Sequence, residues 1–350
     1  MSAGKSPKSI NPEGAKAYRK RNRQDLDATA LVDGILAGDR LVLSRAITLV
    51  ESQLERHQST AAEVISRCLS HTGKATRVGI TGVPGVGKST FIEAFGNYLT
   101  TKGNSVAVLA IDPTSQRTGG SILGDKTRME TLATNPNAYI RPSPAGSSLG
   151  GVARATRETM MLCEAAGFDV LLVETVGVGQ SETSVHSMVD FFLLLSLAGA
   201  GDELQGIKRG IMEMADGIAI NKADGDNLSR AKRARTQLKA ALHLFPPTES
   251  GWIPRTELCS ALENTGINTI WAMIEEHNRL LTGKGLLEAK RNDQARFWMQ
   301  SAIRERLQNA FFGNPEIATR LKKLEQQVID RTLSPFSAAD QLLQYFYSNQ

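Results

Sequence analysis

The sequence predicts an α/β fold built on a mostly parallel sheet and flanked by N-terminal and C-terminal helical extensions. Apolar runs with strand character recur along the middle of the chain, and helical patterns fall between most of them. Strands that alternate with helices favour a parallel sheet that is covered on both faces. Glycine-rich and polar motifs follow several of these runs, as expected where ligands bind at the carboxyl ends of parallel strands.

The chain divides into three predicted regions. Residues 1–70 combine a basic tail with a helical extension, in which breaks at Gly38-Asp39 and between His57 and Thr60 separate three short helices. Residues 71–284 hold the alternating strands and helices. Residues 285–350 form a helical C-terminal arm whose apolar content predicts dimerisation, although packing on its own core is nearly as well supported.

The individual elements follow from apolar periodicity and from the glycines and prolines that interrupt it. In the arm, we expect helices over Leu286–Phe312 and Pro315–Leu333 and a short one after Pro335. Strands are expected at Val78–Thr81, Val106–Ile111, Ala138–Arg141, Val170–Glu174, Phe191–Leu197, Gly217–Asn221 and Trp252–Thr256.

The motif after the first strand is G-V-P-G-V-G-K-S, which fits G-x-x-x-x-G-K-[ST] between a strand and a helix. Its glycines allow successive backbone N–H groups to surround phosphate oxygens at a helix N-terminus. Lys88 is placed to reach the β- and γ-phosphates and the Ser89 hydroxyl to ligate Mg²⁺. This predicts a P-loop NTPase domain. The expected nucleotide contacts are Gly82, Val83, Pro84, Gly85, Val86, Gly87, Lys88, Ser89 and Thr90.

A second motif, Asn221-Lys222-Ala223-Asp224, follows the strand Gly217–Asn221 and selects the base. A carboxylate at Asp224 can accept hydrogen bonds from guanine N1–H and its 2-amino group, which adenine cannot supply. An unpaired buried acceptor costs about 1–3 kcal/mol or more, so such a site rejects ATP. Ser260 and Ala261 follow the last strand and are candidates to bind guanine through a backbone N–H. The chain is therefore predicted to bind GTP and GDP.

Acidic residues at two strand ends suit the magnesium and γ-phosphate side of the site. Glu174 ends an apolar strand and is followed by Gly177, and Asp112 ends another strand. We expect Ser89, Asp112 and Glu174 to hold Mg²⁺, directly or through water. Asp125 is either a further acid around the metal or a helix N-cap. Val178 follows Gly177 and Gln180 comes two residues later, so no glutamine stands directly after the glycine to orient water, and slow intrinsic hydrolysis is expected.

Composition excludes several other classes. With 41% hydrophobic and 22% charged residues and no apolar run long enough to span a bilayer, we expect a soluble, cytoplasmic protein without a membrane or secretory segment. The net charge of +5 lies in residues 1–25, so no nucleic-acid partner is indicated. The cysteines Cys68, Cys163 and Cys259 are too far apart for a disulfide framework or a zinc cluster and are expected to be buried.

Taken together, these motifs resemble the methylmalonyl-CoA mutase-associated GTPases of the MeaB or ArgK type. The resemblance is carried by Gly82–Ser89, Asp112–Ser115, Glu174–Gln180, Gly199–Lys208 and Asn221–Asp224, and it extends from about residue 30 into the C-terminal helices. It implies a SIMIBI-class GTPase domain, a homodimer built partly by the arm, and a GTP-gated chaperone. Such a chaperone loads adenosylcobalamin into a B12-dependent acyl-CoA mutase and protects that mutase.

The resemblance also implies residue roles. By position, Lys88, Ser89, Asp112, Asp125 and Glu174 match the family's nucleotide and magnesium residues, with catalytic roles expected for all but Ser89. Gly199–Lys208 matches an extra switch loop that signals to the mutase. Its charged members Asp202, Glu203 and Lys208, together with Gln180, are the expected switch residues. From the residues alone, an ordinary loop between a strand and a helix explains this stretch equally well.

Three other functions compete with this one. A P-loop kinase acting on a small molecule shares the P-loop, but the guanine motif and the lack of a recognisable acceptor motif count against it. A metallochaperone GTPase for nickel would need clustered Cys and His, whereas the five histidines are scattered. A nucleotide-gated adaptor would hydrolyse GTP only incidentally. The sequence also leaves the partner open among several acyl-CoA mutases.

Overall fold

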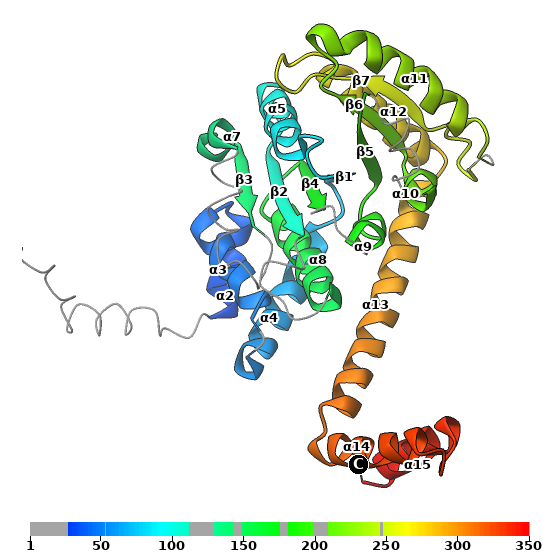
Figure 1. Cartoon of the computed structure of the whole chain (residues 1–350). Coiled ribbons are helices and arrows are strands. Elements are labelled where there is room, and N and C mark those ends of the chain that lie inside the picture. The colour runs from blue at the N-terminus through cyan, green and yellow to red at the C-terminus, as the bar shows by residue number, and fades with distance from the viewer. Residues whose placement is uncertain are drawn as a thin grey trace, which may run out of the picture.

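Seven parallel strands form the centre of the molecule (Figure 1). The computed structural model describes residues 27–52, 54–111, 129–142, 149–175, 181–198, 209–245 and 248–349. The strand order is β3-β2-β4-β1-β5-β6-β7. The strands are β1 (Thr76–Gly82), β2 (Val106–Ile111), β3 (Ala138–Arg141), β4 (Val170–Thr175), β5 (Phe191–Leu197), β6 (Gly217–Asn221) and β7 (Arg255–Leu258). The predicted α/β fold with a parallel sheet is confirmed.

Helices cover both faces of this sheet, which explains why its inner strands are apolar on both sides. On one face, Phe91 and Phe95 pack with Trp271 against β1 and β2. That layer consists of α5 (Lys88–Thr101), α7 (Glu130–Thr134) and α12 (Ile267–Gly283). Its aromatic contacts hold α5, which begins at the P-loop, firmly against the strands.

The other face carries the N-terminal helices and the remaining helices of the central region. Ile35, Leu43 and Ile47 from the N-terminal helices pack with Leu171 and Val173 of β4 in one buried cluster. The helices of this layer are α2 (Ala28–Leu36), α3 (Arg40–Val50), α4 (Glu55–Cys68), α8 (Leu149–Ala165), α9 (Ser181–His186), α10 (Arg209–Met214) and α11 (Leu228–Leu242), with short 3₁₀ turns η1 (Leu69–His71) and η3 (Gly225–Asn227). The N-terminal helices therefore belong to the same hydrophobic core as the sheet.

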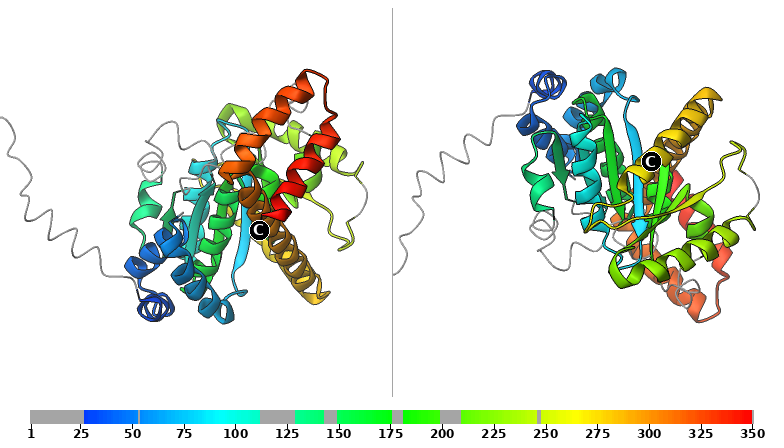
Figure 2. Two further views of the ribbon diagram at one scale, coloured as in Figure 1. Left: turned by 90° about the horizontal axis from the view of Figure 1, so that it is seen from below. Right: turned by 90° about the horizontal axis from the view of Figure 1, so that it is seen from above.

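The C-terminal arm consists of α13 (Leu286–Phe312), α14 (Pro315–Ile329) and α15 (Pro335–Ser348). Figure 1 shows α13 running away from the sheet and carrying α14 and α15 at its far end. In both views of Figure 2, α2 and α3 lie on one side of the molecule and α14 and α15 on the other. The predicted helix Leu286–Phe312 is confirmed, and the next one ends at Ile329 because Arg331 adopts a left-handed backbone with φ of 60°.

Several other predicted boundaries differ from the structure: β1 spans Thr76–Gly82 rather than Val78–Thr81, and β4 ends one residue later than predicted, at Thr175. The break expected between His57 and Thr60 lies earlier, because α4 already begins at Glu55 and its polar first turn is simply an exposed helix face. The last strand begins at Arg255 rather than Trp252, since Pro254 has no N–H to pair within a sheet. Trp252 is nevertheless buried, and its indole Nε1 donates to the Asp216 carbonyl at 2.8 Å.

Candidate functional site

The P-loop connects β1 to α5 with a backbone that only glycine adopts readily. Gly82, Gly85 and Gly87 have φ values of 154°, 82° and 90°. A Cβ at Gly82 would lie 2.6 Å from the carbonyl oxygen of Leu195 in β5, so the chain could not pass there with any side chain. The loop therefore lies at the carboxyl ends of the central strands, where α5 begins and its free N–H groups favour an anion.

Lys88 lies in the first turn of α5, beside the loop. Its Nζ donates to the carbonyl of Gly82 at 2.7 Å and lies 3.5 Å from that of Val83. Burial lowers the pKa of the Lys88 ammonium, while the charges of Glu174 and Glu182 act to raise it. The side chain is thus held at the loop with two acidic groups nearby that favour its charged form.

The strand ends that carry the predicted metal ligands are adjacent. In the sheet register, Glu174 of β4 pairs with Ile80 of β1, and Thr175 pairs with Ile111, the last residue of β2. Glu174 is buried, and the hydroxyl of Thr175 donates to that of Thr81 at 2.9 Å. Ser89 is half-buried in the first turn of α5. The predicted residues Asp112, Asp125, Gly177 and Gln180 lie outside the described residues.

Asn221, at the end of β6, joins the P-loop to the loop that follows β7. Its Nδ2 donates to the Val86 carbonyl at 2.9 Å, and its Oδ1 accepts from the backbone N–H of Ala261 at 3.2 Å. Lys222, which has a φ of 57°, donates from Nζ to the Gly85 carbonyl at 2.9 Å. The contacts with Val86 and Gly85 link residues 135 and 137 positions apart in sequence, and they set the distance between the predicted phosphate and base ends of the site.

Asp224 is held by the loop that follows β7. The Ser260 hydroxyl donates to Asp224 Oδ2, and the same hydroxyl oxygen accepts from the Glu263 backbone N–H at 3.1 Å. Ser260 thus contacts only one of the two carboxylate oxygens, and Asp224 Oδ1 keeps the acceptor capacity that the predicted contact with guanine requires. The structure therefore brings Asn221, Lys222, Asp224, Ser260 and Ala261 together at one end of the P-loop. The N–H of Ala261, however, is already directed to Asn221, so its predicted contact with the base stays a prediction.

Three residues of this site escaped the sequence analysis. Cys259 donates from Sγ to Asn221 Oδ1 at 3.7 Å, and burial raises the pKa of its thiol to about 12, so it acts as a neutral support. Thr81 accepts a hydrogen bond from the Thr175 hydroxyl, and the charge of Glu182 acts to raise the pKa of Lys88. Cys259 directly precedes Ser260, which could have drawn attention to it; nothing local marks Thr81 or Glu182.

The predicted switch residues Asp202, Glu203 and Lys208 lie outside the described residues, as does Gln180. Among the residues that the structure does describe, no cluster of three or more His, Cys, Asp or Glu side chains could hold a metal ion. In the same part of the chain, no helix is both long enough and apolar enough to cross a membrane.

All three cysteines are buried, and none forms a disulfide.

A P-loop at the end of a central parallel strand, braced by an Asn-Lys-x-Asp loop, defines a P-loop nucleotide-binding protein of the GTPase class. Residues 43–316 match the family described as "Methylmalonyl Co-A mutase-associated GTPase MeaB". The chain belongs to this family and is a P-loop GTPase, as the sequence predicted.

Known relatives agree with this assignment. The GTPase ArgK of Escherichia coli is 47% identical over 308 residues, covering 88% of this chain and 93% of the relative. The mitochondrial methylmalonic aciduria type A homolog of Mus musculus is 45% identical over 328 residues, covering 91% of this chain and 79% of the relative. A solved structure described as the LAO/AO transport system kinase has a TM-score of 0.75 and 39% identity, over 93% of this chain and 99% of that one.

Proposed function

We propose that this GTPase is a nucleotide-gated chaperone that controls the loading of adenosylcobalamin into a B12-dependent acyl-CoA mutase and protects that mutase. The description of the family names methylmalonyl-CoA mutase, and the name of the mouse relative refers to methylmalonic aciduria; both support the link to a mutase. One observation supports control by guanine nucleotides. Asn221 bridges the Val86 carbonyl of the P-loop and the backbone N–H of Ala261, so it couples the P-loop to the loop expected to bind the base.

The reaction is GTP and water to GDP and phosphate, and the chain's own residues have distinct tasks in it. Lys88 neutralises charge on the β- and γ-phosphates, and Asp224 pairs with guanine N1–H and the 2-amino group. The predicted metal donors, Ser89, Glu174 and Asp112, offer oxygen atoms, the kind that Mg²⁺ prefers. Bound there, Mg²⁺ would withdraw charge from the β- and γ-phosphate oxygens.

The sequence after Gly177 supports a partner that accelerates GTP hydrolysis. Val178 stands where a water-positioning glutamine would follow Gly177, so hydrolysis by the chain alone should be slow. We assign the coupling to the loop Gly199–Lys208, whose charges Asp202, Glu203 and Lys208 can exchange partners between nucleotide states. A switch of this kind needs different contacts in the two states.

The test is the GTPase rate with saturating methylmalonyl-CoA mutase. The proposal predicts that the mutase accelerates hydrolysis and that Lys208→Ala sharply reduces this acceleration while leaving GTP affinity nearly intact. Lys102→Ala, which removes an exposed lysine at the end of α5, serves as the matched control and should respond like the wild type. Equal stimulation of all three proteins would remove Lys208 from the mechanism, and no stimulation of any of them would contradict the mutase role.

We further propose that the arm forms a homodimer. With it we propose that the chain divides into an N-terminal extension (residues 1–70), the GTPase domain (residues 71–284) and the arm (residues 285–350). At its far end, the arm exposes large apolar side chains of α14 and α15, among them Ile329, Leu343 and Phe336, the last 84% exposed. An apolar cavity of about 590 Å³ lies between α14, α15 and the end of α13, lined by Phe311, Leu324 and Leu342 among others. Apolar surface of this kind is typical of an interface.

A kinase reaction is the second candidate, because the similar solved structure is described as a kinase. A kinase would move the γ-phosphate to an acceptor other than water. Hydrolysis of GTP labelled at the γ-phosphate separates the two reactions: our proposal predicts that the label appears as inorganic phosphate alone.

A further inference from the structure

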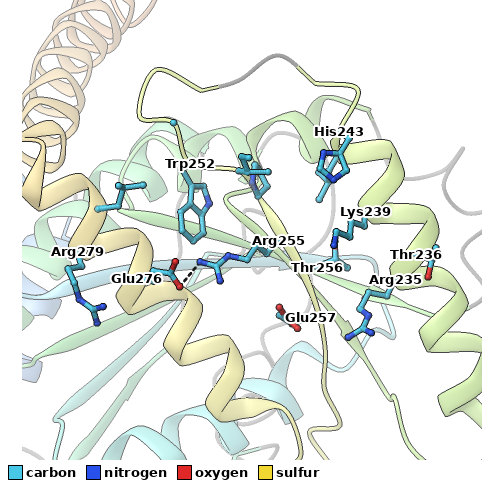
Figure 3. Close-up of a pocket in the computed structure, with 15 residues that line it drawn as sticks. Arg235, Thr236, Lys239, His243, Trp252, Arg255, Thr256, Glu257, Glu276 and Arg279 are labelled. Carbon is cyan, nitrogen blue, oxygen red and sulfur yellow. Dashed lines mark ion pairs between the residues drawn. The ribbon is translucent and has the colours of Figure 1, made fainter.

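The outer edge of the sheet carries a groove that plays no part in nucleotide binding. It has a volume of about 1020 Å³ and is lined by α11, α12 and the consecutive residues Gly251–Glu257. Figure 3 shows Arg235, Lys239 and His243 on one helix and Glu276 and Arg279 on the helix across the groove. Because α11 and α12 cover opposite faces of the sheet, the groove runs along the open edge of β7 between them.

The groove is separate from the GTP site. Arg255 and Glu257 pair with Gly217 and Ala219, at the start of β6. The base-recognition residues Asn221 and Asp224 lie at and beyond the end of that strand. A ligand in the groove would therefore lie along the amino-terminal half of β7, away from the carboxyl ends where nucleotide binds.

Backbone groups of β7 face this groove. Cys259 directs both its N–H and its carbonyl towards β6, donating to Ile220 at 2.9 Å and accepting from Ala223 at 3.0 Å. Backbone direction alternates along a strand in a parallel ladder, so Thr256 points its N–H and carbonyl to the outer edge. β7 is the last strand of the sheet, and this edge has no strand beside it among the described residues. Such an edge can accept an added strand.

A buried hydroxyl gives independent evidence of a missing partner. Thr256 is only 8% exposed, lines the groove, and its Oγ1 has no hydrogen-bond partner in the described structure. A buried hydroxyl without a partner is costly, so a ligand that supplied one would be favoured.

The charges of the groove select the chemistry of that ligand. Its lining contains four cationic side chains, Arg235, Lys239, Arg255 and Arg279, against two acidic ones. Arg255 pairs with Glu276 at 2.6 Å and lies 4.7 Å from the ring centre of Trp252, whereas Arg235 and Lys239 form no ion pair with another described residue. The exposed Ile253 adds an apolar contact in the same groove. The groove thus suits an extended segment that alternates acidic and apolar side chains.

We propose that β7 is a docking edge at which an acidic, extended segment of a partner protein adds an eighth strand to the sheet. The segment pairs with the outer backbone groups of Thr256, and its carboxylates contact Arg235 and Lys239. A second copy of this chain fits poorly, because two cationic grooves would face each other. The chain's own residues 1–25 fit poorly as well, because they carry seven basic and two acidic side chains.

The test uses capped peptides of about seven residues, the length of the extended stretch that lines the groove. They alternate Glu or Asp with Val, Ile, Thr or Phe, and binding to the full-length protein is followed by fluorescence anisotropy. We expect at least one peptide of the set to bind, and binding to weaken as salt increases. The double variant Arg235→Glu/Lys239→Glu should weaken it at least about tenfold. The matched control is Lys232→Glu/Arg233→Glu, which makes the same charge change on exposed residues of α11 outside the groove and should have little effect.

A second probe distinguishes strand pairing from simple charge attraction. Methylating alternate backbone nitrogens of the best peptide removes the hydrogen bonds along one edge and keeps every charge, so strand addition predicts loss of binding when the edge facing β7 is blocked. Binding that survives methylation of either edge would overturn the proposal. The proposal also fails if no peptide of the set binds. Inorganic pyrophosphate serves as a simple anion for comparison: if it binds in the groove and the peptides do not, the groove is an anion site and not a docking edge.

Discussion

Asn221 shows how much of the site depends on single side-chain contacts. It contacts the P-loop at Val86, the base loop at Ala261 and the thiol of Cys259, and it is almost completely buried. The motif Asn-Lys-x-Asp could be recognised in the sequence, but the amide's double role could not, because its partners come from loops distant in the chain. A buried amide with its hydrogen bonds satisfied is a rigid spacer, and it keeps the phosphate and base ends at a fixed separation.

Gly87→Ala should disturb this spacer more than Gly85→Ala does. Both glycines have positive φ, so both substitutions carry the same backbone strain, roughly 1–2 kcal/mol. Only at Gly87 would the new Cβ meet another side chain, Asn221 Nδ2 at 3.0 Å; at Gly85 it meets nothing within 4 Å. We expect Gly87→Ala to be less stable than Gly85→Ala by about 1 kcal/mol, the net contribution of one hydrogen bond.

Urea unfolding of both variants without nucleotide measures this difference, since it excludes effects on phosphate binding. Equal midpoints for the two variants would show that Asn221 tolerates the methyl group and is not a rigid spacer.

At the scale of elements, the sequence was most informative where the pattern is local. The strands β2, β3, β5 and β6 and the long helix α13 begin and end where predicted, because an apolar or helical pattern and the residues that interrupt it are visible in a short window. The start of β7 was misplaced, because Trp252 is buried and extended without taking part in the strand ladder. How α13 attaches to the core could not be predicted, since its contacts connect residues about a hundred positions apart.

That attachment rests on a buried ion pair. Asp190, fully buried before β5, accepts from Arg291 Nε at 2.8 Å and from its Nη2 at 2.6 Å, and it also accepts from the Arg77 backbone N–H. Arg291 donates further to the Ala75 carbonyl at 2.7 Å. Trp298, two turns along α13, donates to the Ser187 carbonyl at 3.1 Å. The first half of the helix is thus part of the core.

Arg291→Met should lower the free energy of unfolding by about 3–5 kcal/mol, because it leaves the Asp190 carboxylate buried without its charged partner. Arg296→Met is the matched control on the same helix. Its pair with Asp293 is exposed on both sides, so its loss should cost less than about 1 kcal/mol. Denaturant unfolding of the two variants provides the comparison, and a similar small loss in both would contradict the anchoring role of Arg291.

At the scale of the whole molecule, the arm has two parts with different tasks. Its first half is anchored to the core through Arg291 and Trp298. The helices α14 and α15 lie at the far end of α13 (Figure 1), and they expose large apolar side chains such as Ile329 and Phe336. The sequence suggested both dimerisation and packing on the core as alternatives for the arm. The structure shows core packing for the first half and leaves an apolar surface on the second.

A chain that ends at Gly313 should therefore bind GDP like the full-length protein but elute as a monomer, because it lacks α14 and α15 and keeps the core contacts of α13. A chain that ends at Gly285 is the informative comparison: it also removes Arg291, and it should be unstable as well as monomeric. Size-exclusion chromatography with light scattering at micromolar concentration gives the answer. A full-length monomer, or a dimer that persists after the cut at Gly313, would contradict the proposed interface.

The Ser260 hydroxyl holds Asp224 in place, and recognition of guanine by the Asp224 carboxylate can be tested directly. The measurement is calorimetric titration of GTP, ATP and xanthosine triphosphate into wild type, Asp224→Asn and the neighbouring control Asp226→Asn. With Mg²⁺ present, wild type and the control should prefer GTP over ATP by at least about 100-fold, corresponding to about 3 kcal/mol of lost pairing. Asp224→Asn should bind GTP more weakly and favour the xanthine nucleotide, whose ring carbonyl accepts where guanine's amino group donates. If ATP bound to the wild type as tightly as GTP, or if Asp224→Asn kept the preference for guanine, the account of this site would be wrong.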